Sequence, residues 1–335
     1  MVRKYNFFFS LVLLAVVAYS CKKNIGNEFD IRDPELEIIE YDKSIYKKGS
    51  TIHFPLDFPE QNLPVNYVEF RVGDLNSPII LSSPHDGTLA PDSIGGRDHP
   101  TAEDARDTHT TPLVERIADT LEARTGMRPH IIVNVLSRKK MDPNRSRDEA
   151  FVKHPDALDA WDGYQNFLKI ARQIVTDNVG KGLYLDIHGH GHPKDRIEVG
   201  YLLTPADLND SLSNFYLDLK AGKSSIFAVG KGSLVKFSEL IRGASSFGAL
   251  LWDEKHPAVP SDQPGNQWPG SDDYFNGGYC TLAYGSLRGG NVSAIQLETS
   301  YKNERDPVKH ATAGGAIARA TINYFKLHYG MNLQK

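Results

Sequence analysis

Hydrophobic and polar positions alternate most regularly over residues 183–187, where Leu, Leu and Ile alternate with Tyr and Asp. A period of two predicts an extended strand, because successive side chains of a strand point to opposite faces. Glycines and a proline follow within 189–193 and end the strand. His188, His190 and His192 are therefore expected at its carboxyl end, where open α/β sheets bind ligands. Taken alone, this run could also be a solvated, histidine-rich turn.

A second run of the same design lies at residues 78–87, which read Pro-Ile-Ile-Leu-Ser-Ser-Pro-His-Asp-Gly. The apolar residues 79–81 predict a core strand over 79–82, and His85 follows it close to a glycine. Two strand ends in one chain thus carry a histidine, which suggests that His85 and His188 contact the same metal ion.

The remaining hydrophobic pattern predicts strands at 131–136 and 294–297 and helices at 111–125, 156–178 and 311–327. Apolar residues of 111–125 fall on one helical face, and Gly126 suits the C-cap. Strand, helix, strand, helix, strand is the order of an α/β fold. We expect three layers, in which helices flank a mostly parallel or mixed sheet.

Two parts of the chain have a weaker pattern. Short alternating pieces at 36–41, 50–56 and 67–72 are interrupted by prolines, which predicts a small β appendage or edge strands over 35–75. Residues 84–106 and 259–273 are rich in glycine, proline and aspartate and predict long loops. Between them, 212–218 and 232–242 look helical at least in part.

The amino terminus has the pattern of an export signal. Arg3 and Lys4 precede an apolar run at 7–18, and Ser20 stands directly before Cys21. The layout resembles a bacterial lipoprotein signal, in which the cysteine after the cleavage site is lipidated. A plain signal peptide or a single membrane anchor is the alternative, although so short a run favours a signal. We expect a signal over 1–20, lipidation of Cys21, a tether over 21–34, and a lipid-anchored protein on the periplasmic or surface side of the bacterial cell envelope.

Composition narrows the class further. The 335 residues include 40% hydrophobic and 24% charged residues, which is ordinary for a globular protein. A formal net charge of -4 and the lack of a basic run give no reason to expect a nucleic-acid partner. The chain has two cysteines. If Cys21 carries lipid, Cys280 has no internal partner, and we interpret it as a buried structural thiol.

Catalytic zinc commonly has three protein ligands, often histidine and carboxylate, and keeps one position for water. His85 and His188 form the expected pair, and Asp107 is our choice for the third ligand because it directly precedes the helix at 111–125. Capping of that helix is the alternative role of Asp107. Four further residues compete for the third position: Asp86, Asp98, Asp104 and His109.

Other polar residues at predicted strand ends could act on a substrate. Glu298 ends the strand at 294–297 and could take a proton from water, although an ordinary edge glutamate is the alternative. An arginine of the segment 138–145 could bind a substrate carboxylate with two parallel hydrogen bonds, or lie solvated in a surface turn. His190 and His192 could support the metal ligands or contact the substrate. The Gly-Gly pair before Tyr279 would let backbone approach a ligand.

Together these motifs resemble the N-formylglutamate amidohydrolase family, which is related in fold to the zinc carboxypeptidases. The resemblance covers roughly residues 79–327 in matching order and implies a phosphorylase/hydrolase-like core over 76–330. Residues of about 196–275 depart from the family's pattern, and we interpret them as an insertion. The matching segments are Ser83-Pro84-His85-Asp86-Gly87, the Asp107 segment, Arg138 with Asp142-Pro143-Asn144-Arg145, Asp186-Ile187-His188, Gly277-Gly278-Tyr279 and Gln296-Leu297-Glu298.

The resemblance implies one zinc ion per chain and hydrolysis of an amide bond next to a carboxylate. On the matching positions His85, Asp107 and His188 would hold the zinc, and Glu298 would be the general base. The substrate would be a small N-acyl amino acid or peptide, and Asn144 with Arg145 would orient its carboxylate. Four further residues are candidates for substrate contacts: Arg138, His190, Gly278 and Tyr279. A carboxypeptidase-like hydrolase of peptides or cell-wall peptides is one alternative, and a lipoprotein that binds a ligand without turnover is another.

Overall fold

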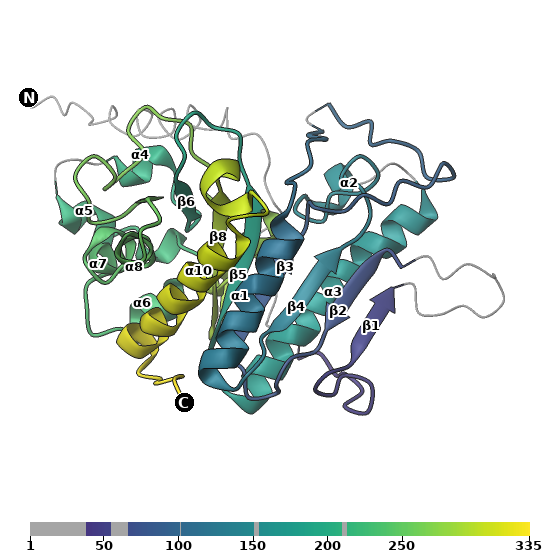
Figure 1. Ribbon diagram of the computed structural model, residues 1–335, viewed down its shortest axis with the longest axis horizontal. Coiled ribbons are helices and arrows are strands. Elements are labelled where there is room, and N and C mark those ends of the chain that lie inside the picture. Colours follow the sequence, from purple (N-terminus) through teal and green to yellow (C-terminus); the bar gives the residue numbers. More distant parts are fainter. Residues whose placement is uncertain (1–37, 55–65, 101, 151–153, 210–212) are drawn as a thin grey trace, which may run out of the picture. The chain divides into compact units, whose positions relative to one another are not determined.

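A mixed sheet of eight strands organises the computed structural model (Figure 1). The structure describes residues 38–54, 66–100, 102–150, 154–209 and 213–335. Leu36–Lys335 forms one compact unit. The predicted signal, the lipidation site at Cys21 and the tether lie outside the described residues.

The central strands are parallel, and strands of the opposite direction flank them. Along the sheet the order is β1-β2-β4-β3-β5-β8-β6-β7. The pairs β4-β3, β3-β5, β5-β8 and β6-β7 are parallel, whereas β1-β2, β2-β4 and β6-β8 are antiparallel. The strands are β1 (Thr51–Phe54), β2 (Val68–Arg71), β3 (Ile79–Ser83), β4 (His130–Asn134), β5 (Gly182–Gly189), β6 (Ile197–Gly200), β7 (Ala258–Val259) and β8 (Val292–Thr299).

Helices cover both faces of this sheet, so the predicted three-layer α/β fold is confirmed. α1 (Thr110–Thr125) and α10 (His310–Tyr324) lie side by side on one face (Figure 1), and α3 (Pro155–Asn178) lies on the other. The remaining helices are α2 (Arg147–Ala150), α4 (Pro205–Leu208), α5 (Asn214–Asp218), α6 (Phe227–Gly232), α7 (Phe237–Arg242), α8 (Phe247–Asp253) and α9 (Tyr279–Tyr284).

The alternation along β5 assigns its side chains to the two faces. Leu183, Leu185 and Ile187 belong to the core under α1 and α10, whereas Tyr184 belongs to the core under α3. All eight residues but the last are buried, as expected for a strand covered on both sides. By the same period of two, His188 points to the α3 face of the sheet.

Local signals in the sequence explain where the main helices begin and end. α1 ends at Gly126, which has a φ of 77° that few other residues adopt without strain. α3 begins with Pro155 in its first turn, and the side chain of His154 accepts the main-chain N–H of Asp156. Both helices match the predicted ranges to within one residue.

The weaker parts of the pattern gave less accurate predictions. Residues 38–41 form no strand, although a strand was expected over 36–41, whose first two residues lie outside the described part of the chain. The helix expected over 232–242 begins only at Phe237. β6 and β7 were not anticipated, and both belong to the segment 196–275, which otherwise adds short helices to the core shared with α1 and α10.

A further prediction concerns Cys280. Cys280 is buried and has no disulfide partner, and its thiol donates to the Pro143 carbonyl oxygen at 3.3 Å, which agrees with a structural role. Burial raises the pKa of this thiol well above its usual value. Among the helices of the described residues, none combines the length and hydropathy needed to cross a bilayer.

Candidate metal centre

The carboxyl ends of three neighbouring strands carry the residues of the candidate site. β3, β5 and β8 are parallel and adjacent, so their carboxyl ends lie at one edge of the sheet. His85 lies two residues after the end of β3. His188 is the last residue but one of β5, and Glu298 is the last residue but one of β8. This edge is the usual ligand-binding position of an open α/β sheet.

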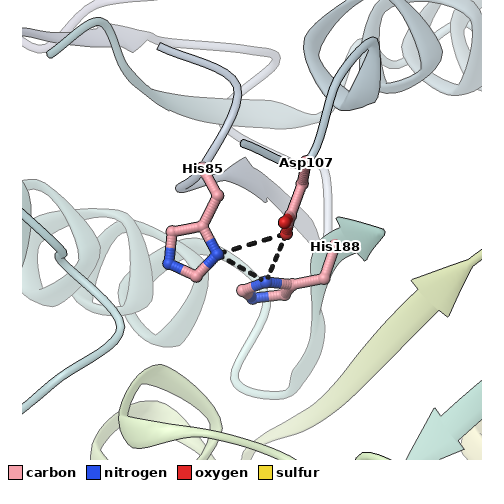
Figure 2. Close-up of side chains that lie close together, drawn as sticks. All are labelled: His85, Asp107 and His188. Carbon is pink, nitrogen blue, oxygen red and sulfur yellow. Dashed lines mark hydrogen bonds and ion pairs between the residues drawn. The ribbon is translucent and has the colours of Figure 1, made fainter. Parts of the chain in front are cut away.

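Three ligand atoms form a nearly equilateral triangle at this edge (Figure 2). Nδ1 of His85 lies 3.1 Å from Oδ2 of Asp107 and 3.1 Å from Nδ1 of His188. The third side, from Nδ1 of His188 to Oδ2 of Asp107, is 3.2 Å. All three residues are buried, with exposed fractions of 2%, 6% and 1%. The structure therefore brings together the three residues that the sequence analysis chose.

The triangle fits a tetrahedral metal ion. Zinc lies about 2.0–2.1 Å from nitrogen and oxygen ligands, which places neighbouring ligand atoms of a tetrahedron about 3.3 Å apart. The observed sides of 3.1, 3.1 and 3.2 Å come close to this spacing without any movement of the backbone. Two imidazole nitrogens and one carboxylate oxygen are also the donor set that zinc prefers.

Buried carboxylates hold the far nitrogen of each ring. Nε2 of His85 lies 2.7 Å from Oδ1 of Asp142, and Nε2 of His188 lies 3.1 Å from Oδ2 of Asp186. Both carboxylates are completely buried. A proton kept on Nε2 by such a partner leaves the lone pair of Nδ1 for a metal ion, which is how metal-binding histidines are usually oriented. The hydroxyl of Ser82 donates to the other oxygen of Asp186.

The charges at this edge favour a cation. Burial lowers the pKa of His188, but Asp186 and Asp107 outweigh it and hold this pKa well above the usual value. Burial raises the pKa of Asp107, but His85 and His188 outweigh it and hold that pKa well below the usual value. The same carboxylates that stabilise a protonated ring would stabilise a divalent ion between the rings.

The side chain of Asp107 does not cap α1. Asp86 performs that task, because its two oxygens accept the main-chain N–H groups of His109 at 2.9 Å and Thr111 at 3.0 Å. The side chain of Asp107 instead points to the two rings, and its Oδ2 also accepts the N–H of Gly189 at 3.1 Å. The other competitors do not join the triangle: Asp98 and Asp104 are exposed, and His109 is the N-cap residue of α1.

Glu298 lies beside the triangle on the neighbouring strand. It is the register partner of His188 in the β5-β8 pair, so both side chains occupy the same face of the sheet. Oε1 of Glu298 accepts the side-chain N–H of Gln296 at 2.8 Å. Burial raises the pKa of Glu298 to about 8, and His188 opposes the rise while Asp107 adds to it.

A second group of possible ligands, His190, His192 and Glu198, is better explained by hydrogen bonds. Nδ1 of His190 accepts the main-chain N–H of His192 at 3.1 Å, and Nε2 of His190 lies 2.8 Å from the Arg196 carbonyl oxygen. Nδ1 of His192 lies 2.7 Å from Oε1 of Glu198. Both nitrogens of His190 are thus occupied, and a distance of 2.7 Å is that of a direct hydrogen bond.

Two residues expected to contact substrate, Arg138 and Asn144, also contact other residues of the candidate metal centre. Arg138 is 7% exposed, and its Nε donates to Oδ2 of Asp142 at 2.8 Å, so it fixes the carboxylate that holds His85. Asn144 is also buried. Its Nδ2 lies 3.3 Å from Nε2 of His188, and its Oδ1 accepts the N–H of Cys280 at 2.8 Å.

Arg145 is the cation of this segment that remains open. Its side chain is partly exposed, and among the described residues its guanidinium donates only to the Asn144 carbonyl oxygen, at 3.2 Å. Gly278 approaches the same place, because a Cβ on it would lie 2.3 Å from Nδ2 of Asn144. The ring of Tyr279 is partly buried and packs 5.9 Å from that of Trp161.

Sequence reasoning missed the supporting residues. Asp186 and Asp142 were noted only as parts of motifs, although an aspartate two residues before His188 on the same strand face is a signal that could have been used. Glu198 could have been found from the short Ile-Glu-Val alternation of β6. Arg305, which bonds to three segments of the site, follows no periodic pattern and gave no signal.

No protein-family model matches the sequence, and no curated protein matches it. Several solved structures do. The N-formylglutamate amidohydrolase of Ralstonia eutropha JMP134 is 14% identical over 76% of this chain and 95% of its own, with a TM-score of 0.43. A gene product of Agrobacterium tumefaciens is 11% identical over 78% and 95%, with a TM-score of 0.41. The succinylglutamate desuccinylase of Chromobacterium violaceum is 12% identical over 80% and 66%, with a TM-score of 0.32. The family that the motifs resemble is thus among the matching structures.

Proposed function

We propose that this chain is a zinc-dependent hydrolase that cleaves an amide bond next to a carboxylate, in the manner of an N-formylglutamate amidohydrolase. The observation that carries the proposal is the triangle of His85 Nδ1, Asp107 Oδ2 and His188 Nδ1, whose sides of 3.1 to 3.2 Å suit one tetrahedral ion. These three residues would hold the zinc. When bound, zinc polarises a carbonyl oxygen and lowers the pKa of water toward neutrality.

Glu298 would accept and pass on the proton in this reaction. Its Oε1 is engaged by Gln296, which leaves Oε2 to take a proton from water and return it to the leaving amine. The burial that raises its pKa to about 8 makes the carboxylate a better proton acceptor near neutral pH. The register of β5 and β8 supports this role, because it pairs Glu298 with His188 at the edge of the sheet where the triangle lies.

Arg145 would bind the carboxylate of the substrate. Arg138 already pairs with Asp142 within the protein, whereas the guanidinium of Arg145 forms no direct ion pair among the described residues and donates only to the Asn144 carbonyl oxygen. An arginine fork can hold a carboxylate with two parallel hydrogen bonds. Asn144 precedes Arg145 and would help to hold it near the triangle, since its Nδ2 lies 3.3 Å from Nε2 of His188.

The test begins with metal analysis of the purified chain and continues with hydrolysis assays on N-formyl-L-glutamate, other N-acyl amino acids and short peptides. Glu298→Gln should keep the zinc and lose turnover by roughly 100- to 10,000-fold, the usual contribution of a general base. Glu254→Gln is a matched control, because Glu254 pairs with Arg319 away from the site. Absence of zinc, or full turnover by Glu298→Gln, would refute the proposal.

The range of substrates that are cleaved distinguishes the related activities. A preference for N-acyl amino acids supports an amidohydrolase, and a preference for peptides or cell-wall peptides supports a carboxypeptidase-like enzyme. If zinc and ligand bind while all of these substrates stay intact, the protein is a binding lipoprotein and the hydrolase proposal is wrong.

We also propose that a lipid on Cys21 anchors the mature protein in the bacterial cell envelope, with the catalytic domain on the periplasmic or surface side. The support is the sequence alone: Arg3 and Lys4, the apolar run at 7–18 and Ser20 before Cys21. Cells fed a tagged fatty acid should label the wild-type chain and not Cys21→Ser. Equal labelling of the two chains would contradict the proposal.

A further inference from the structure

Arg305 is a buried cation whose hydrogen bonds go to main-chain and hydroxyl oxygens. It ends a single π-helical turn, Tyr301–Arg305, that follows β8, and it is 5% exposed. Its Nη1 donates to the Thr108 carbonyl oxygen at 2.8 Å, its Nη2 to that of His190 at 2.9 Å, and its Nε to that of Thr299 at 3.1 Å. A longer contact of 3.4 Å joins Nη1 to the hydroxyl of Thr108.

Each of these three acceptors lies within two residues, in the sequence, of a residue of the candidate metal centre. Thr108 follows Asp107, His190 lies two residues after His188, and Thr299 follows Glu298. One rigid guanidinium fork therefore connects the loop that carries Asp107 to the strand ends that carry the other two groups. Because the fork is planar, it fixes the relative positions of all three segments.

Asp107 needs such support more than its neighbours do. His188 and Glu298 are held by the ladder between β5 and β8, but Asp107 belongs to a loop that has no regular ladder before α1. Its main chain has one described bond toward the site, from its N–H to the His85 carbonyl oxygen at 3.1 Å. The neighbouring residues of this loop are held as well, His109 by Asp86 and Ala105 by Arg138. Of these bonds, the one from Arg305 to Thr108 ties the loop to the carbonyl oxygens at the ends of β5 and β8.

The strand end beside Arg305 is shaped to admit the guanidinium. A Cβ added to Gly189 would lie 2.3 Å from Nε and 2.4 Å from Cζ of Arg305, so any side chain here would displace the fork. The charge also faces the site: Asp107 and Glu298 are the two strongest favourable charges that act on this arginine, although burial opposes its charged form. Burying a guanidinium whose hydrogen bonds go only to neutral oxygens lowers the stability of the fold, so we look for a functional role of Arg305.

We infer that Arg305 is the positioning residue that sets the third ligand of the metal centre, by fixing the Asp107 loop against the ends of β5 and β8. The inference rests on the proposed function, because it assigns Arg305 to the same zinc site. Without the fork, Asp107 would sample positions in which its Oδ2 no longer completes the triangle with the two rings, and the site would bind zinc less tightly.

The experiment measures the zinc affinity of the purified full chain by competition with a chromophoric chelator, alongside thermal unfolding of the zinc-free protein. Arg305→Met should weaken zinc binding by about 10- to 100-fold, the usual effect of losing a residue that orients a metal ligand. Arg305→Lys keeps the charge but not the fork, so its zinc affinity should lie between those of wild type and Arg305→Met. Arg319→Met removes an arginine that pairs with Glu254 and should leave zinc affinity unchanged.

The outcomes separate the possible failures. A merely structural role predicts a lower unfolding temperature for Arg305→Met with zinc affinity within about twofold of wild type, and this result would overturn the inference. If Arg305→Met does not fold, the zinc affinity of Arg305→Lys decides, since a value equal to wild type also overturns it. If the wild-type chain binds no zinc, the proposed function itself is wrong. That result differs from one in which wild type binds zinc and the Arg305 variants bind it equally well.

Discussion

A single buried histidine at the opposite end of the sheet should make the protein less stable in mild acid. His130 begins β4 and is completely buried, and its Nδ1 accepts the N–H of Gly73 at 3.2 Å. Its Nε2 has no hydrogen-bond partner among the described residues. Burial lowers the pKa of His130 from 6.5 to about 4, although Asp74 opposes the change.

The sign of the effect follows from the two states. The unfolded chain binds a proton on this histidine near pH 6.5, whereas the folded chain keeps the ring neutral until about pH 4. Between these values the unfolded state binds more protons, so the free energy of unfolding falls as the pH falls. One pKa unit corresponds to about 1.4 kcal/mol, so acidification from about pH 7 to about pH 5 should cost the folded state about 2 kcal/mol through this group alone.

His130→Asn tests this value, because the asparagine oxygen can replace Nδ1 as acceptor for Gly73 and does not titrate. Urea unfolding at about pH 7 and about pH 5 should show that the variant loses about 2 kcal/mol less stability than wild type over this range. Phe167→Leu is a suitable control, since Phe167 is buried, carries no charge and packs against Phe70, whose ring also contacts that of His130. Equal pH dependence of wild type and His130→Asn would refute the reasoning.

The remaining predictions concern the metal centre and the helix beside it. Asp142→Asn and Asp186→Asn, which remove charge from the carboxylates that orient the two histidines, should each weaken zinc binding by about 10- to 100-fold in chelator competition. Asp107→Ala should abolish tight zinc binding, whereas Asp86→Ala should keep it and instead lower the free energy of unfolding by about 1 to 2 kcal/mol, because it removes the cap of α1. If Asp86→Ala loses zinc and Asp107→Ala keeps it, the two roles have been assigned the wrong way round.

The meeting of His85 and His188 could be predicted from sequence for a physical reason. Each histidine directly follows a short apolar run that reads as a buried strand, and the helices between such runs make the strands parallel. Parallel strands place their carboxyl ends at one edge, so two residues more than 100 positions apart converge without any information beyond the local pattern. Their Nδ1 atoms lie 3.1 Å apart in the structure.

The choice between Asp107 and Asp86 could not be settled in the same way. Both precede the same helix, and either could cap it, because a capping side chain needs only an oxygen near the first free N–H groups. The outcome depends on how the loop from β3 to α1 folds back over the strand end. That path follows from long-range contacts such as the bond of Arg305 to Thr108, which leave no trace in the local sequence.

The position of β6 shows a second limit. Its four residues carry a weak alternation, and its antiparallel pairing with β8 arises only when the segment 196–275 turns back on the sheet. This pairing places Glu198 opposite Glu298, and through Glu198 it places His192. From the sequence, His192 was expected to support the metal ligands or contact the substrate, because all three histidines belong to one run. In the structure its Nδ1 lies 2.7 Å from Oε1 of Glu198 on β6.

The arginines around the candidate metal centre explain why we propose a separate residue for binding a substrate carboxylate. Four buried carboxylates surround the triangle or belong to it: Asp107, Asp142, Asp186 and Glu298. The guanidinium groups of Arg97, Arg138 and Arg305 lie near these carboxylates, and all three are occupied by bonds within the protein. A substrate carboxylate would therefore need another cation, and we propose Arg145 for this role, because its guanidinium donates only to the Asn144 carbonyl oxygen among the described residues.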